Sequence, residues 1–187
     1  MLELKRQIFH ALLGIILVFL VYYNFIWLNF LIILFLIGVV ISYISSKKKI
    51  LIVEWFLKNF DREEKIRGMG VLSYILGTII VLALFEKSIA MASILILALG
   101  DSFCHIGKFG KLKFSFNKNK SIEGSVIGII AATIGAMIFV PFFQAVLGSL
   151  IAMIVESFDV KMKNTRIDDN LSIPLVSGLV MTIVKIL

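Results

Sequence analysis

The chain alternates long apolar stretches with short charged segments, and the lengths of the apolar stretches predict its helices. Residues 7–46 carry no formal charge. At ~1.5 Å per residue one helix over them would be about 60 Å long, twice the ~30 Å hydrocarbon core of a bilayer. They therefore predict two membrane spans that turn near Tyr22, Tyr23 and Asn24.

Three shorter apolar segments predict further spans. Residues 72–85 and 89–99 flank a turn at Glu86 and Lys87, and the second of them ends just before Asp101. Residues 171–184 predict a C-terminal span with Pro174 in its first turn, where a missing amide hydrogen does little harm.

Residues 124–155 form another uncharged stretch, with Pro141 midway. A single helix of ~48 Å is too long for one span and slightly short for two, and proline breaks a helix interior. We interpret the stretch as a helical hairpin, which brings the predicted total to about seven spans.

Composition places the chain among integral membrane proteins. Of its 187 residues, 60% are hydrophobic and 17% charged, whereas soluble domains use roughly 45–50% apolar residues. We expect a single all-α polytopic domain over 1–187. The lone Cys104 excludes an internal disulfide, and the two histidines form no structural zinc pattern. Lys5 and Arg6 precede an apolar run as in a signal peptide, but no small-residue cleavage site follows, so we expect this segment to be retained.

The cations are distributed asymmetrically in the seven-span arrangement. One side receives 17 of the 19 lysines and arginines, and the other keeps Lys87 and Lys185. The positive-inside rule then predicts a cytoplasmic N-terminus. The net charge of +7 suits anionic headgroups or phosphates. No base-stacking aromatics punctuate the lysine runs, so nucleic acid is not an expected partner. Residues 47–67 mix apolar and charged positions and predict a cytoplasmic interfacial segment.

A polar segment, which we interpret as a catalytic loop over 100–124, joins two of the apolar runs. It contains Gly100-Asp101, Gly107-Lys108, Gly110 and Lys120-Ser121-Ile122-Glu123-Gly124. A half-buried aspartate is costly unless it is paired or holds a metal, and glycines let backbone amides approach an anion. The alternative interpretation is that Asp101 caps a helix end while the lysines face anionic lipid.

Other polar residues are expected on the same membrane surface. Glu3, Arg6 and His10 share one face of the first helix. They predict a shared site, or alternatively an ion pair with a histidine at the interface. Further acidic residues lie at the ends of later spans: Glu123, Glu156, Asp168 and Asp169. Singly each suits a helix end, but together with Asp101 they predict divalent-metal coordination, because hard cations take several carboxylate oxygens.

These motifs together resemble a known family. The motifs that carry the resemblance are Glu3-x-x-Arg6-x-x-x-His10, Gly100-Asp101 with Gly107 and Gly110, Lys120-Ser121-x-Glu123-Gly124, and Asp168-Asp169-Asn170-Leu171-x-x-Pro174 after Glu156. In their order and spacing they are similar to motifs of the polyprenol, dolichol and phytol kinase family, which includes CTP-dependent diacylglycerol kinase. The family often has Arg-Lys where this chain has Arg6-Gln7. The resemblance spans nearly the whole chain and implies a compact prokaryotic or archaeal membrane enzyme with its active site on the cytoplasmic face.

The resemblance implies transfer of the terminal phosphate of a nucleoside triphosphate, often CTP, to a membrane lipid alcohol with Mg²⁺ or another divalent cation. We expect Asp101, Glu123 and Asp168 or Asp169 to bind the metal or to accept the substrate proton. Lys120 and Arg6 would neutralise phosphate, and His10 and Glu156 would orient these groups. The expected nucleotide-binding residues are Gly100, Gly107, Lys108, Gly110, Ser121, Gly124 and Asn170.

Other classes of function remain as alternatives. A cytidylyltransferase of the CDP-diacylglycerol synthase type has a segment like 120–124, although its His-Gly-Gly and Asp-Arg run is absent here. A small ion-coupled transporter would place its acids at mid-membrane, whereas these flank the spans. A structural membrane protein leaves the clustered acids unexplained.

Overall fold

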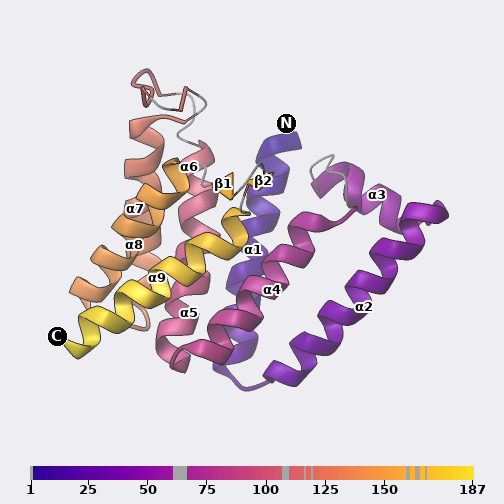
Figure 1. Cartoon of the computed structure of the whole chain (residues 1–187), viewed down its shortest axis with the longest axis horizontal. Helices are drawn as coiled ribbons and strands as arrows, with labels where there is room; N and C mark the ends of the chain where they lie inside the picture. The colour runs from indigo at the N-terminus through magenta and orange to yellow at the C-terminus, as the bar shows by residue number, and fades with distance from the viewer. Residues whose placement is uncertain are drawn as a thin grey trace.

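The computed structural model describes residues 2–60, 67–106, 110–115, 117–118, 120–158, 161–162, 165–166 and 168–187. The regular structure of these residues is helical apart from one small hairpin and an isolated β-bridge between Lys113 and Ser121 (Figure 1). The elements are α1 (Leu2–Tyr22), α2 (Leu28–Lys47), α3 (Leu51–Phe60), α4 (Met69–Leu84), α5 (Lys87–Leu95), the π-helix η1 (Ile96–Asp101), α6 (Ser102–Ile106), α7 (Ile122–Ala136), α8 (Phe142–Ser157), β1 (Lys161–Met162), β2 (Thr165–Arg166) and α9 (Asp169–Ile186). Lys161 pairs with Arg166, and Met162 with Thr165, in the antiparallel hairpin.

Four helical stretches are long and apolar enough to cross a membrane, which makes this an integral membrane protein. They are 3–22, 28–47, 87–105 and 169–186. The apolar helices α4, α7 and α8 are shorter, with 15 or 16 residues each, or about 24 Å at most, and a bilayer accommodates such helices by local thinning. The total of seven spans and the cytoplasmic N-terminus stay predictions.

The predicted breaks between helices coincide with the observed ones. Asn24 adopts a positive φ of 57° in the turn between α1 and α2. Pro141 occupies the N-cap of α8, five residues after the end of α7, which confirms the hairpin over 124–155. The last helix begins earlier than expected, at Asp169, so Pro174 lies in its second turn and not in its first.

The predicted catalytic loop over 100–124 is wrong at both ends. The helix that begins at Lys87 continues through η1 and α6 to Ile106, so Gly100 and Asp101 are helical, and Ile122 already belongs to α7. Asp101 therefore does not cap a helix end. The wider turn of a π-helix, a feature frequent at functional sites, carries Asp101 as its last residue.

The stretch from α5 to α6 is the centre of the bundle. In an 18-residue window of 87–105, 78% of the residues are buried, against 11% in a window of the same length in α2. Small residues permit this close packing: a Cβ atom on Gly128 of α7 would lie 2.8 Å from the carbonyl oxygen of Gly100. By contrast, α2 lies at the edge, packs chiefly against α4, and buries only Leu31 and Ser45.

The two ends of the bundle differ in polarity. The starts of α1, α4 and α9 and the end of α8 lie at one end, together with α3 and the hairpin, whereas the α1–α2 turn and the C-terminus lie at the other (Figure 1). At that other end Lys87 donates to Asn24 Oδ1 at 2.6 Å, and Lys185 pairs with Glu86. The predicted interfacial segment 47–67 contains α3, whose Leu51 and Trp55 are exposed. Residues 61–66 lie outside the described residues.

We expect single cysteines to report this polarity in cells, in a Cys104→Ala background. Cysteines at Asn24 and Glu86 should react with a membrane-impermeant maleimide from outside. Those at Asn59 and Asn117 should react only after permeabilisation, because they lie at the cation-rich end. Labelling of position 117 in intact cells would contradict the cytoplasmic N-terminus.

Candidate active site

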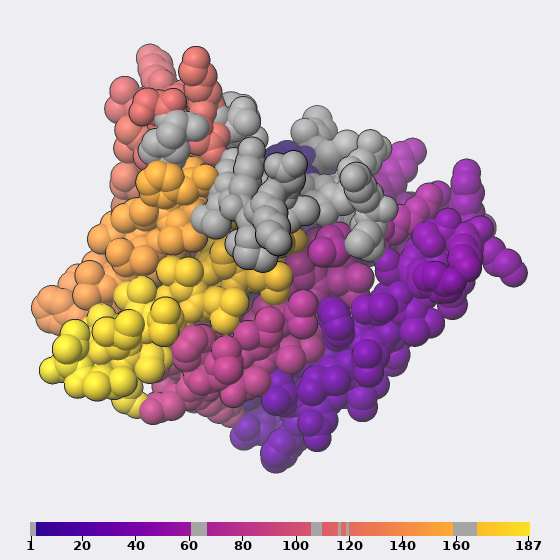
Figure 2. Space-filling model, viewed as in Figure 1, coloured from indigo at the N-terminus to yellow at the C-terminus, as the bar shows by residue number. Residues whose placement is uncertain are grey.

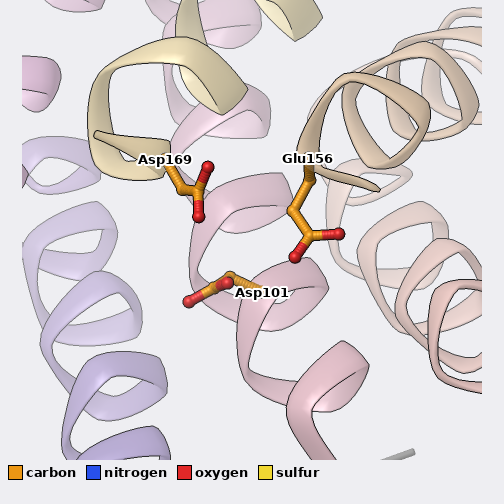
Figure 3. Close-up of side chains that lie close together, drawn as sticks. All are labelled: Asp101, Glu156 and Asp169. Carbon is orange, nitrogen blue, oxygen red and sulfur yellow. The ribbon is translucent and has the colours of Figure 1, made fainter. Parts of the chain in front are cut away.

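Three carboxylates from distant parts of the chain meet at the polar end of the bundle. Asp101 ends η1, Glu156 lies in the last turn of α8, and Asp169 opens α9. One carboxylate oxygen from each lies within 4.8 Å of the others. Figure 3 shows Glu156 and Asp169 reaching from two helix ends toward Asp101. We call this group the carboxylate triad.

The triad is compensated by a lysine on one side. Lys120 Nζ lies 2.5 Å from Glu156 Oε1 and also donates to the backbone carbonyl of Glu156. Glu156 is 1% exposed. Burying an unpaired carboxylate is strongly unfavourable, and the Lys120 ammonium offsets part of that cost for Glu156. Cys104 Sγ completes the contacts with a 3.6 Å donation to Glu156 Oε2.

Two histidines flank Asp101 on the other side. His10 Nε2 of α1 lies 3.8 Å from Asp101 Oδ2. His105 Nδ1 of α6 lies 3.3 Å from Asp101 Oδ1 and 2.9 Å from the Asp101 carbonyl oxygen. The two rings therefore hold the Asp101 side chain between α1 and α6. Glu3 of α1 pairs with Arg6 and lies 3.9 Å from His105, which extends the polar network to the N-terminal turn.

A small pocket of about 70 Å³ opens beside the triad. The first helix contributes Arg6 and His10 to its wall, η1 contributes Asp101, and the start of α9 contributes Asp168 and Asp169. The wall is thus basic on one side and acidic on the other. A phosphate group and a cation could be held side by side in it.

The donor set of the triad fits a divalent hard cation. Three carboxylate oxygens converge from three helices, and Mg²⁺ is usually held by one or two carboxylates together with substrate phosphates. Asp101 and Glu156 are both buried, which excludes the solvated alternative for an acidic cluster. The sequence predicted a metal set of Asp101, Glu123 and Asp168 or Asp169. Asp101 and Asp169 belong to the triad, but Glu156 stands there in place of Glu123.

Glu123 and Asp168 have other contacts in the structure. Glu123 Oε1 accepts the backbone N–H groups of Lys111 and Leu112, at 2.9 and 3.0 Å, and so anchors the segment before α7. Asp168 is the N-cap of α9, where its Oδ1 accepts the Asn170 N–H at 2.9 Å. Asp168 nevertheless lines the pocket, one residue from the triad.

Several expected nucleotide-binding residues have packing or capping contacts, and one of them, Asn170, also lines the pocket. Ser121 caps α7 and accepts the Gly124 N–H at 3.1 Å. A Cβ on Gly100 would lie 2.8 Å from Met153, and one on Gly110 would lie 2.5 Å from Glu123 Oε2. The Asn170 amide donates to Gly70 O and Ser73 Oγ and ties α9 to α4. Gly107 and Lys108 lie outside the described residues.

Sequence reasoning missed two residues of the site. Tyr74 of α4 lines the pocket, stacks edge-on against His10 with ring centroids 4.6 Å apart, and has no hydrogen-bond partner for its buried hydroxyl among the described residues. Tyr74 carried no sequence signal because it lies within an apolar run. His105 is four residues after Asp101, a helical spacing that the loop interpretation hid.

Comparison with known proteins finds a relative that matches nearly the whole chain. The chain is 31% identical over 184 residues to an uncharacterised protein of Methanocaldococcus jannaschii, covering 96% of this chain and 92% of that one. The chain belongs to the family of this archaeal protein. No protein-family model and no solved structure match it.

Lipid-alcohol kinases are further relatives. The probable chloroplastic phytol kinase of Triticum aestivum is 31% identical over 138 residues, 64% of this chain and 44% of the kinase. The CTP-dependent diacylglycerol kinase 1 of Eremothecium gossypii is 29% identical over 140 residues, 60% of this chain and 43% of the kinase. This chain thus spans less than half of either kinase. These homologues support membership in the polyprenol and phytol kinase family.

The neighbouring residues Asp168 and Asp169 allow a matched test of the triad. Asp169→Asn replaces a carboxylate ligand by a neutral amide, so we expect Mn²⁺ affinity, measured by electron paramagnetic resonance, to fall at least about tenfold. Asp168→Asn removes the same charge from the pocket wall but keeps the cap, because asparagine also caps helices. Its affinity should stay within about threefold of the wild type. Equal losses in both variants would contradict the assignment of Asp169 rather than Asp168 as the ligand.

Proposed function

We propose that this protein is a CTP-dependent kinase that transfers the terminal phosphate to the hydroxyl of a membrane lipid alcohol, such as a polyprenol or dolichol. The observation that carries the proposal is the carboxylate triad beside a basic pocket wall at the polar end of an apolar bundle. A lipid alcohol has its hydroxyl at the interface and its tail in hydrocarbon. Related proteins are named phytol kinase and CTP-dependent diacylglycerol kinase, which supports both the acceptor class and the donor.

Phosphoryl transfer needs charge neutralisation and alignment more than covalent chemistry. Asp101, Glu156 and Asp169 would hold the divalent cation, here Mg²⁺, and that ion would neutralise charge on the β- and γ-phosphates when bound. Arg6 lines the pocket and supplies a cation toward the phosphates. Lys120 pairs with Glu156, so we assign it to compensating the negative charge of the triad rather than to direct phosphate contact.

The acceptor hydroxyl must lose a proton as it is phosphorylated. The bond from the hydroxyl oxygen to the γ-phosphorus forms, the bond from that phosphorus to the β–γ bridging oxygen breaks, and CDP leaves. His10 lines the pocket, its Nε2 lies 3.8 Å from Asp101 Oδ2, and it is the residue we assign to take the proton. Asp101 would then stabilise the imidazolium that results.

The proposed setting is a cell membrane of prokaryotic or archaeal type, with the pocket on the cytoplasmic face where CTP is available. The polar end of the bundle holds the carboxylate triad, the basic residues at the start of α1, and the interfacial helix α3. We treat 1–187 as one functional domain.

A donor-labelling assay tests the function directly. Purified protein in lipid nanodiscs would receive CTP labelled either in the γ-phosphate or in the cytidine ring, Mg²⁺, and phytol, a polyprenol or diacylglycerol. We expect γ-label but no cytidine label in the lipid fraction. Cytidine label there would indicate a cytidylyltransferase instead, and label in neither case would contradict lipid phosphorylation.

Arg6 and Lys5 provide a matched pair for the nucleotide subsite. Arg6 lines the pocket, whereas its neighbour Lys5 is exposed outside it. A charge-assisted contact of ~1.5–3 kcal/mol predicts that Arg6→Ala lowers kcat/KM for CTP by about tenfold to a hundredfold. Lys5→Ala should change it by about twofold at most, because exposed charges are screened. A defect confined to the lipid KM would instead assign Arg6 to the acceptor site.

A further inference from the structure

An apolar groove lies between the peripheral helix α2 and the rest of the bundle, at the same end as the pocket. Its volume is about 270 Å³. Its lining comes from three elements: Gly38, Ile41, Ser42 and Ser45 of α2; Ile52, Val53, Phe56 and Leu57 of α3; and Arg67, Gly68, Val71 and Leu72 around the start of α4. We call it the α2–α4 groove.

The few polar groups of this groove already have partners. Ser42 Oγ donates to the Arg67 carbonyl oxygen at 2.5 Å, Arg67 Nη1 lies 3.4 Å from Glu54 Oε1, and Ser45 donates to the Ser42 carbonyl oxygen. The remaining lining is hydrocarbon. A ligand of the groove is therefore recognised by apolar contact and not by hydrogen bonds.

The groove adjoins the pocket of the carboxylate triad. Val71 of α4 lines both cavities. Phe56, in the wall of the groove, packs edge to face against Phe9 with ring centroids 5.2 Å apart, and Phe9 and its neighbour Phe60 line the pocket. One layer of side chains thus separates an apolar groove from a polar pocket.

We propose that the α2–α4 groove binds the hydrocarbon chain of the acceptor lipid alcohol and presents its hydroxyl to the pocket past Val71. This inference rests on the proposed function. An amphiphilic substrate needs an apolar site and a polar site in contact, and α2 makes such an entrance because it packs chiefly on α4 at the edge of the bundle. The position of α2 apart from α7 and α8 is visible in Figure 2.

Gly38 sets the width of the groove. A Cβ atom there would lie 2.9 Å from Leu72 Cδ2, the end of a flexible side chain. Larger side chains on this face of α2 would displace Leu72 into the groove or occupy it themselves. The residues of this face, and not those of the carboxylate triad, would then set which chain lengths are accepted.

A second apolar groove serves as the control. It is lined by Ile15, Val18 and Phe19 of α1 with Leu95, Leu99 and Phe139 among others, and it shares no lining residue with the pocket of the triad. Ile41 of the α2–α4 groove and Ile15 of this one are both isoleucines in long helices, 40% and 44% exposed. Substituting each by tryptophan fills one groove at a time.

The wild-type protein would first be photolabelled in phospholipid nanodiscs with a hexadecanol that carries a diazirine at mid-chain. We expect the labelled peptides to come from α2 and from the start of α4, and excess phytol to suppress the label. Labelling mainly of residues around Ile15, or labelling of the α2–α4 groove that phytol does not suppress, would overturn the proposal, the latter because bulk phospholipid would then be the occupant.

Kinetics of the two tryptophan variants give a second measurement. Ile41→Trp should raise the KM for phytol at least about tenfold and leave the KM for CTP unchanged, whereas Ile15→Trp should change either by about twofold at most. Equal effects of the two variants would overturn the proposal. If the wild-type protein phosphorylates no lipid alcohol, the proposed function fails, and the photolabelling pattern still decides whether the groove binds an alcohol.

Discussion

The convergence of three carboxylates at one end of an apolar bundle, two of them buried and Asp169 half-buried, is the constraint on which the rest of this structure depends. Isolated charges of like sign in a medium of low polarity repel each other and lose their hydration, so each needs a partner. Glu156 has Lys120, and Asp101 lies between two histidines. A divalent cation would compensate the remaining negative charge of the triad, because it can be coordinated by oxygens from several helices at once. The elements that supply these partners are thereby required to meet at one point.

Close helix packing is what lets them meet. A Cβ on Gly77 of α4 would lie 2.2 Å from the Asn170 carbonyl oxygen, so α9 can approach α4 only because residue 77 is glycine. Pro174 lacks the amide hydrogen that would bond this carbonyl within the helix. The side chain of Asn170 donates to α4 at the same contact. Together these contacts fix the start of α9 and therefore the position of Asp169.

The peripheral helices contrast with this rigid centre. The 87–105 stretch is mostly buried, whereas α2 is mostly exposed and α3 presents Leu51 and Trp55 outward. A catalytic group must be held in place by packing, but an acceptor that diffuses in the bilayer must enter from the side. This bundle has a densely packed core with polar residues at one end, and a loosely packed helix, α2, at its edge. It therefore meets both requirements of the proposed reaction.

The sequence predicted the number of apolar segments and their breaks at Asn24 and Pro141, because helix length and hydrophobicity are local properties. It also predicted that acidic residues gather at one end of the bundle. Which acids converge did not follow. Glu123, Asp168 and Asp169 all stand at helix starts, and only the angles at which the helices pack decide that Asp169 meets Asp101 while Glu123 accepts backbone amides. The sequence also did not predict that the helix continues through Asp101. A glycine followed by an aspartate favours a loop when the tertiary contacts of the segment are unknown. Tertiary packing outweighed that local preference, since α7 and α8 surround the segment and leave no room for an open turn.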